Sequence, residues 1–124
     1  MEQAVDEAQE LIENLNLTGI DGIYTANLPE ELIEDTGKTV ILIQDVNIGL
    51  DDEGNNIFHT LKRQVEVQIF YKINLDVEPS DIQLALLGVF FSNHWTMAQN
   101  ITSSVDPNTK QLTQTFYFTQ NKQI

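Results

Sequence analysis

The side chains of this sequence that could do acid–base or metal chemistry are few and lie far apart. His59 and His94 are its two histidines, and it contains no cysteine. A metal site needs imidazoles to converge with a carboxylate at a spacing that one helix or turn can supply, and neither histidine lies in such a motif. We therefore expect both at the surface or at an interface. A small hydrolase that pairs one of them with a carboxylate is the enzyme alternative.

Carboxylates gather in one stretch that resembles a calcium loop only at its start. The segment 45–56 opens with Asp-X-Asn-X-Gly, but its glycine stands fifth instead of sixth, and its twelfth residue is Asn56 instead of glutamate. Asp51, Asp52 and Glu53 lie among turn-forming residues, where exposed carboxylates stay solvated and ionised. The stretch therefore predicts neither a calcium site nor an acid–base pair.

Other motifs of catalysis or ligand binding are missing from the sequence. The pair Ser103–Ser104 has no partnering base nearby, and neither a phosphate-binding glycine loop nor a nucleophile elbow occurs. Lys62 and Arg63 form a lone basic pair without the interleaved aromatic residues of a nucleic-acid-binding patch. We therefore expect no enzyme activity, no cofactor, no metal and no nucleic-acid readout.

The strongest compositional feature is the distribution of charge. The net charge is −13, and residues 1–53 carry all of it, with fourteen of the 19 acidic residues and the single base Lys38. Such a half repels nucleic-acid phosphates and anionic membranes and keeps the chain soluble. The longest apolar run, from Leu84 to Phe91, is far shorter than the ~20 residues of a membrane helix. The absence of cysteine and of a signal peptide favours assembly in a reducing, intracellular place.

The length of 124 residues and the hydrophobic fraction of 41% predict one globular domain. Apolar residues recur at spacings of three and four over residues 2–15, which predicts an amphipathic helix. A short strand is expected at 22–25, one helical turn at 29–32, and a strand buried on both faces at 39–44. The turn formers at 51–56 predict an exposed loop.

The clearest strand of the sequence lies in the second half. Apolar and polar residues alternate from 64 to 72, and this strand could begin at 57 and pair with residues 39–48 across the acidic loop. Ser80 and Gln83 form a capping box, which predicts a helix from Ser80 to about Asn93.

Two further strands are expected at 95–102 and 110–119. The predicted order is helix, two strands, helix and two strands, or α-β-β-α-β-β. This order favours an α+β fold, in which a mainly antiparallel sheet of about four to five strands carries two packed helices.

Bulky apolar residues of the second helix and its flanks can serve either the core or a contact between subunits. Phe90, Phe91 and Trp95 are expected in the core, with a subunit interface as the functional alternative, because aromatic residues concentrate binding energy. The candidate interface residues are Leu87, Phe90, Phe91, Trp95 and Phe70.

Three segments carry a resemblance to a known family: the strand Gln64–Tyr71, the Ser80–Asn93 helix and the closing segment Asp106–Phe118. Together they resemble tail-component proteins from long-tailed phages of Gram-positive hosts. These are similar in size and element order to tail terminator, or tail completion, proteins. The resemblance spans most of the chain and makes residues 1–124 a single tail-terminator-like domain. It rests on strand alternation, a helix and an aromatic closing strand.

The resemblance implies a structural virion protein that is not an enzyme and needs no cofactor. Terminators form a six-fold ring at the head-proximal end of the tail tube, stop tube polymerisation and support head joining, and DNA passes through the ring. The implied partners are other copies of the chain in a hexameric ring, the tail tube protein and head–neck proteins, with no membrane. The implied location is the head-proximal end of a long non-contractile tail, after assembly in the host cytoplasm.

DNA should pass through such a ring without binding to its wall, so acidic groups that line the bore would be useful. Charge acts over only about 8 Å at physiological salt, so only loops near the DNA would matter. The candidate DNA-facing loop contains Asp51, Asp52 and Glu53. Two alternatives stay open: a head-closure or neck adaptor, which is also a ring, and an acidic interaction module such as a DNA-mimic inhibitor.

Overall fold

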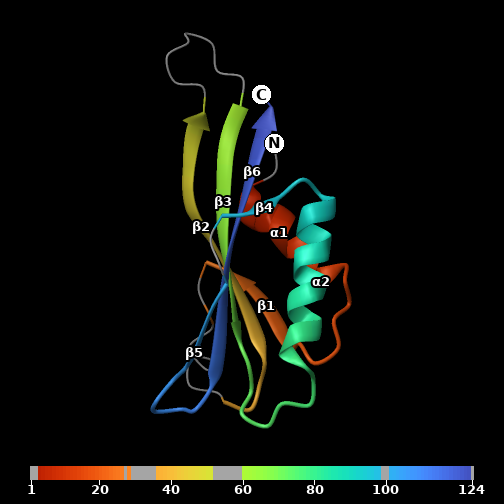
Figure 1. Ribbon diagram of the computed structural model, residues 1–124, viewed down its shortest axis with the longest axis vertical. Coiled ribbons are helices and arrows are strands. Elements are labelled where there is room, and N and C mark those ends of the chain that lie inside the picture. Colours follow the sequence, from red (N-terminus) through yellow and green to blue (C-terminus); the bar gives the residue numbers. More distant parts are fainter. Residues whose placement is uncertain (1–2, 27, 29–35, 52–59, 99–100, 124) are drawn as a thin grey trace.

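The computed structural model of the protein describes residues 3–26, 28, 36–51, 60–98 and 101–123. Both helices pack on one face of a single twisted sheet (Figure 1). In chain order, the described elements are α1 (Ala4–Glu13), β1 (Gly22–Thr25), β2 (Val40–Asp51), β3 (Thr60–Phe70), α2 (Pro79–Ser92), β4 (Thr96–Met97), β5 (Thr102–Val105) and β6 (Leu112–Gln123).

The sheet has six strands in the order β1-β2-β3-β6-β4, and β5 also pairs with β6. The β1–β2 pair is parallel, and the pairs β2–β3, β3–β6, β4–β6 and β5–β6 are antiparallel. The predicted α+β class and the mainly antiparallel sheet are confirmed. The described strands number six instead of four or five, and the order is α-β-β-β-α-β-β-β.

The single strand predicted at 95–102 is wrong, because β4 and β5 occupy this stretch as two short pieces. Met97 pairs with Phe118 and Thr102 pairs with Thr115. Between these two pairs the sequence has four residues on one side and two in β6, so β4 and β5 cannot continue one regular ladder. The helical turn predicted at 29–32 lies outside the described residues.

The long hairpin predicted for the middle of the chain is confirmed. β2 and β3 pair from Val40 opposite Phe70 to Asp51 opposite Thr60, with an irregularity between Asp45 and Ile48. The far ends of β2, β3 and β6 extend past the helices (Figure 1). This part of the sheet rises above the layer that covers the rest of it.

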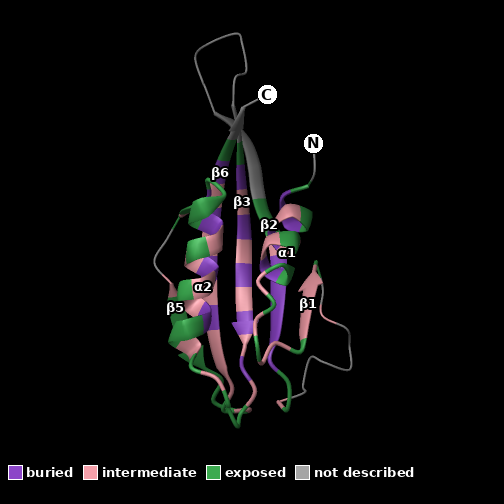
Figure 2. Cartoon of the chain, turned by 90° about the vertical axis from the view of Figure 1, so that its right-hand side faces the viewer, coloured by how far each residue is buried: buried purple, intermediate pink, exposed green. Residues whose placement is uncertain are grey.

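Side-chain alternation decides which face of the sheet becomes the core. In β3 the alternate residues Arg63, Val65, Val67 and Ile69 are buried. Residues that pair with them in β2 and β6, namely Ile41, Ile43, Phe116 and Phe118, are buried as well. In α1, Val5, Ala8 and Ile12 lie at helical spacing and complete the same core. Figure 2 looks onto this helix layer, with the buried stripes of the strands behind it.

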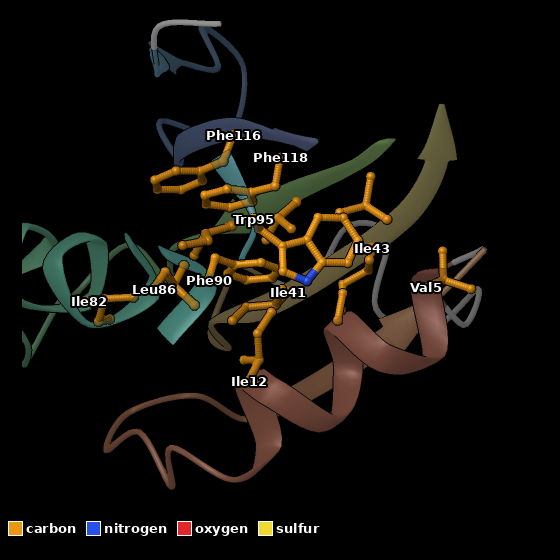
Figure 3. Close-up of a cluster of buried hydrophobic side chains, with 14 of the residues drawn as sticks. Val5, Ile12, Ile41, Ile43, Ile82, Leu86, Phe90, Trp95, Phe116 and Phe118 are labelled. Atoms are coloured by element: carbon orange, nitrogen blue, oxygen red, sulfur yellow. The ribbon is translucent and has the colours of Figure 1, made fainter. Parts of the chain in front are cut away.

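Aromatic rings fill the space between α2 and β6 (Figure 3). The ring of Phe90 stacks on Phe118, with centroids 4.1 Å apart and an interplanar angle of 2°. It also meets Trp95 edge-on, at 5.7 Å and 85°. Such contacts contribute about 0.5–1.5 kcal/mol each beyond the burial of their area.

The predicted capping box at the start of α2 is wrong. The N-cap is Glu78, with Pro79 at the start of the helix and no side-chain hydrogen bond at the cap. The fixed φ of proline suits the first helical position, so the helix begins before Ser80 can act as its cap. The predicted end at about Asn93 agrees with the C-cap at that residue.

Candidate interaction surfaces

A buried arginine joins α1, β3, β6 and the end of α2. The side chain of Arg63 is 2% exposed, and its Nη1 lies 2.9 Å from the Glu7 carboxylate. The same nitrogen donates to Gln120 Oε1 at 3.0 Å, and the guanidinium lies 5.6 Å from the Trp95 ring centroid. Gln120 in turn donates to the carbonyl of Asn93 at 3.1 Å. The arrangement satisfies a buried cation on several sides, which is a structural role rather than a catalytic one.

A second buried polar group links β3, β6 and β5. The Tyr71 hydroxyl donates to Gln114 Oε1 at 2.7 Å, and Gln114 Nε2 donates to Ser103 Oγ at 3.3 Å. Burial raises the pKa of Tyr71 from 10.0 to about 12, because the phenolate would lose its hydration. Tyr71 therefore stays neutral at physiological pH and pins β5 to the sheet through Gln114.

The side chains that could act as acids, bases or metal ligands do not come together within the part of the chain that the structure describes. No group of three or more His, Asp or Glu residues in that part could hold a metal ion. His94 is exposed, as expected, and follows α2 with a φ of 70°. His59 lies outside the described residues. Neither described helix is long and apolar enough to cross a membrane.

The candidate DNA-facing loop is only partly within the described residues. Asp51 ends β2 opposite Thr60, at the part of the sheet that extends past the helices. Asp52 and Glu53 lie outside the described residues. The role of these three carboxylates stays a prediction.

The candidate interface residues fall into three groups. Phe90 is fully buried and Trp95 is 1% exposed, so both belong to the core and offer no area to a partner. Leu87 is half-buried against that core. Phe91 is 50% exposed on α2, although it follows a fully buried phenylalanine.

Phe70 lies on the sheet face opposite the helices. It pairs with Val40 on one side and Thr113 on the other, and it is partly exposed. The neighbouring residues of β3 and β6 on this face are mainly uncharged glutamine, threonine and tyrosine. The carboxylate of Glu66 accepts a hydrogen bond from Tyr117, which raises the pKa of Tyr117. The open face is therefore polar but poor in free charge.

Five exposed large apolar residues of the described chain were not among the candidates: Val46, Ile73, Leu75, Leu84 and Val105. Two of them are the most exposed. Leu84 on α2 is 67% exposed, and Val105 on β5 is 58% exposed. Residues 82–105 contain no Asp, Glu, Lys or Arg, although 20% of the chain is charged. This uncharged run comprises β4, β5 and the part of α2 after Asp81, and it is the signal that could have pointed to Leu84 and Val105.

Comparisons with known proteins agree with the α+β fold. The sequence profile of the family described as "Protein of unknown function (DUF806)" matches residues 3–123. No curated protein matches the sequence. A solved structure titled "Cryo-EM Structure of an Extracellular Contractile Injection System, PVC sheath/tube terminator in extended state" has a similar fold, with a TM-score of 0.52 and 10% identity. The similarity covers 100% of this chain and 58% of that chain, so this chain spans little more than half of its length.

Proposed function

The chain belongs to the family described as a protein of unknown function (DUF806), and we propose that it is a structural tail terminator rather than an enzyme. In this role, copies of the chain form a ring at the head-proximal end of a long non-contractile phage tail. The ring stops polymerisation of the tail tube and supports joining of the head. The partners are other copies of the chain, the tail tube protein and head–neck proteins, and the DNA passes through without specific binding.

The observation that carries the proposal is the fold similarity over 100% of the chain to a protein whose title calls it a sheath/tube terminator. The sequence resemblance to phage tail components points in the same direction. In the described part of the chain, the structure holds no cluster of metal-ligating residues that would favour a metal-dependent enzyme.

The contact between copies is best supplied by the sheet. A closed ring needs a heterologous contact, in which two different surfaces of the chain meet. Every residue of β5 is exposed, and the strand carries no charge that would block pairing with another chain. Phe70 on the open sheet face adds partly exposed aromatic area across β6 from this strand, since Thr113 of β6 pairs with both Phe70 and Ser104. We assign the contact between copies to the β5 edge and the open face, and Phe90 and Trp95 support it from the core.

The acidic loop retains its proposed place near the DNA. Replacing Asp51, Asp52 and Glu53 with Asn, Asn and Gln should slow DNA ejection while tails still assemble, because the repulsion that keeps the DNA from binding is removed. Ejection kinetics measured on purified particles test this. Unchanged kinetics would remove the loop from the DNA path.

Electron microscopy of tails from particles that lack this protein tests the proposed function directly. Overlong tubes without heads are expected, because nothing would stop polymerisation. Tails of normal length with detached heads would instead identify a neck adaptor. Normal, complete particles together with tight binding of a basic partner by the purified chain would favour an acidic interaction module.

A further inference from the structure

The outward side of the helix layer carries two neighbouring stripes of different chemistry, one on each helix. On α2, Leu84, Gly88 and Phe91 are exposed at spacings of four and three, which places them on one side of the helix. This apolar stripe is opposite to Ile82, Leu86 and Phe90, which face the core. Figure 2 looks onto this side and shows exposed residues along both helices.

The α1 helix carries an acidic stripe on the same side of the molecule. Asp6, Glu10 and Glu13 are exposed at spacings of four and three, opposite to the buried Ala8 and Ile12. The helix contains no Lys or Arg. Because α1 and α2 both lie on the same sheet face and contact each other, a partner that covers one stripe meets the other (Figure 2).

A surface depression continues the apolar stripe at the end of α2. Its lining residues are Phe91, His94, Trp95, Thr96 and Met97. A protruding apolar side chain of a partner could enter this depression, and this is the arrangement that gives interface residues most of their binding energy.

The charge of the layer decides between the possible occupants. A second copy of the chain would bring its own net charge of −13 against the acidic stripe. The described lysines offer little to complement that charge: Lys62 lies towards one end of the sheet, opposite Gly49. Lys38, Lys72 and Lys110 lie at the other end, where the Lys72 N–H donates to Thr39 Oγ1, and Lys72 already pairs with Asp76 at 3.3 Å. A partner with apolar side chains beside Lys or Arg would instead satisfy both stripes.

We propose that the outward side of the helix layer is the docking surface for a different protein, which presents apolar side chains flanked by Lys or Arg. The inference rests on the proposed function, because it names the surface by which the ring meets a non-identical partner. It reassigns Leu87 and Phe91 from the contact between copies to the contact with this partner. Self-assembly then belongs to the sheet, and heterotypic docking to the helices.

The test uses the full chain and, as probe, the purified tail tube protein of the same virus. Affinity is measured by interferometry at low and high salt, and tube length by electron microscopy. The variant Leu84→Ser/Phe91→Ser should lower the affinity at least about tenfold, because it removes the apolar anchors. The variant Asp6→Asn/Glu10→Gln/Glu13→Gln should lower it about threefold to tenfold and flatten its salt dependence.

Ile73→Ser is the matched control, because Ile73 is 48% exposed, close to the 50% of Phe91, but lies between β3 and α2, outside both stripes and outside β5. It should leave the affinity for the tube protein within about twofold of wild type. Light scattering should show that the helix-layer variants self-assemble as the wild type does.

Four results would overturn the inference. If Ile73→Ser lowers the affinity as much as the helix-layer variants do, the docking surface is not specific. Loss of self-assembly in Leu84→Ser/Phe91→Ser would assign the stripe to a second copy. If the helix-layer variants cap tail tubes as well as the wild type does, the docking surface is refuted and the terminator role stays intact. If the wild type itself neither binds nor caps tubes, both the docking surface and the terminator role are overturned.

Discussion

Replacement of Arg63 with methionine is the sharpest test of how this fold holds its helix layer to the sheet. Arg63 is buried at 1% exposure, where it meets Glu7 of α1, Gln120 of β6 and the Trp95 ring. Methionine keeps an unbranched, flexible apolar side chain in the site and removes every polar contact. The variant therefore measures what the polar contacts of the guanidinium contribute to the free energy of unfolding.

The expected cost follows from the three contacts. Loss of the donor to Gln120 Oε1 costs about 1 kcal/mol, and loss of the stacking on Trp95 costs about 0.5–1 kcal/mol. Loss of the 2.9 Å ion pair costs ~1–2 kcal/mol, below the ~3–5 kcal/mol of a fully buried pair, because the Glu7 side chain is 20% exposed. The free energy of unfolding should fall by about 2.5–4 kcal/mol, or ~10–16 °C in Tm for a domain of this size.

Urea unfolding followed by tryptophan fluorescence measures this loss, because Trp95 is the sole tryptophan and lies beside Arg63. Lys62→Met is the matched control: Lys62 is the adjacent base of β3 but is exposed, so its loss should change stability by less than about 0.5 kcal/mol. If Arg63→Met and Lys62→Met unfold at the same urea concentration, the buried network contributes no net stability and this reasoning is refuted.

Two further predictions follow from particular positions. Gly19 has a φ of 90°, and a Cβ there would lie 2.6 Å from Val77 Cγ1, so Gly19→Ala should destabilise the fold by ~1–3 kcal/mol. Gly88→Ala, where a Cβ meets nothing within 4 Å on the helix surface, should instead stabilise it by about 0.5–1 kcal/mol, and thermal unfolding of the pair checks the opposite signs. Because the pKa of Tyr71 is raised from 10.0 to about 12 in the folded state, its contribution to stability is complete below pH 10 and is lost as the pH rises towards 12. Tyr71→Phe should remove that alkaline loss, and also destabilise the fold by about 1 kcal/mol at neutral pH, because Gln114 Oε1 loses its donor; an unchanged alkaline profile in urea unfolding would contradict the assignment.

Much of the fold is local in origin and was therefore readable from the sequence. The period of two in β3 and β6 decides which side chains face the core, because successive residues of a strand point to opposite faces. The spacing of three and four in α1 does the same for a helix. The burial of Arg63 was readable in the same way, since it has the same parity as Val65 and Val67, whereas its neighbour Lys62 has the opposite parity.

The sequence by itself determined the α+β class, the long hairpin and the acidic first half, because alternation, turn formers and charge are properties of short segments. Only the tertiary structure decided which apolar residues of α2 are core and which are surface. Spacing groups Phe90 with Ile82 and Leu86, and Phe91 with Leu84, but both groups are apolar. The sequence therefore could not decide which group faces the core, and the answer depended on where β6 and Trp95 lie. The outward apolar stripe of α2 and its alignment beside the acids of α1 exist only because both helices pack on one face of the sheet.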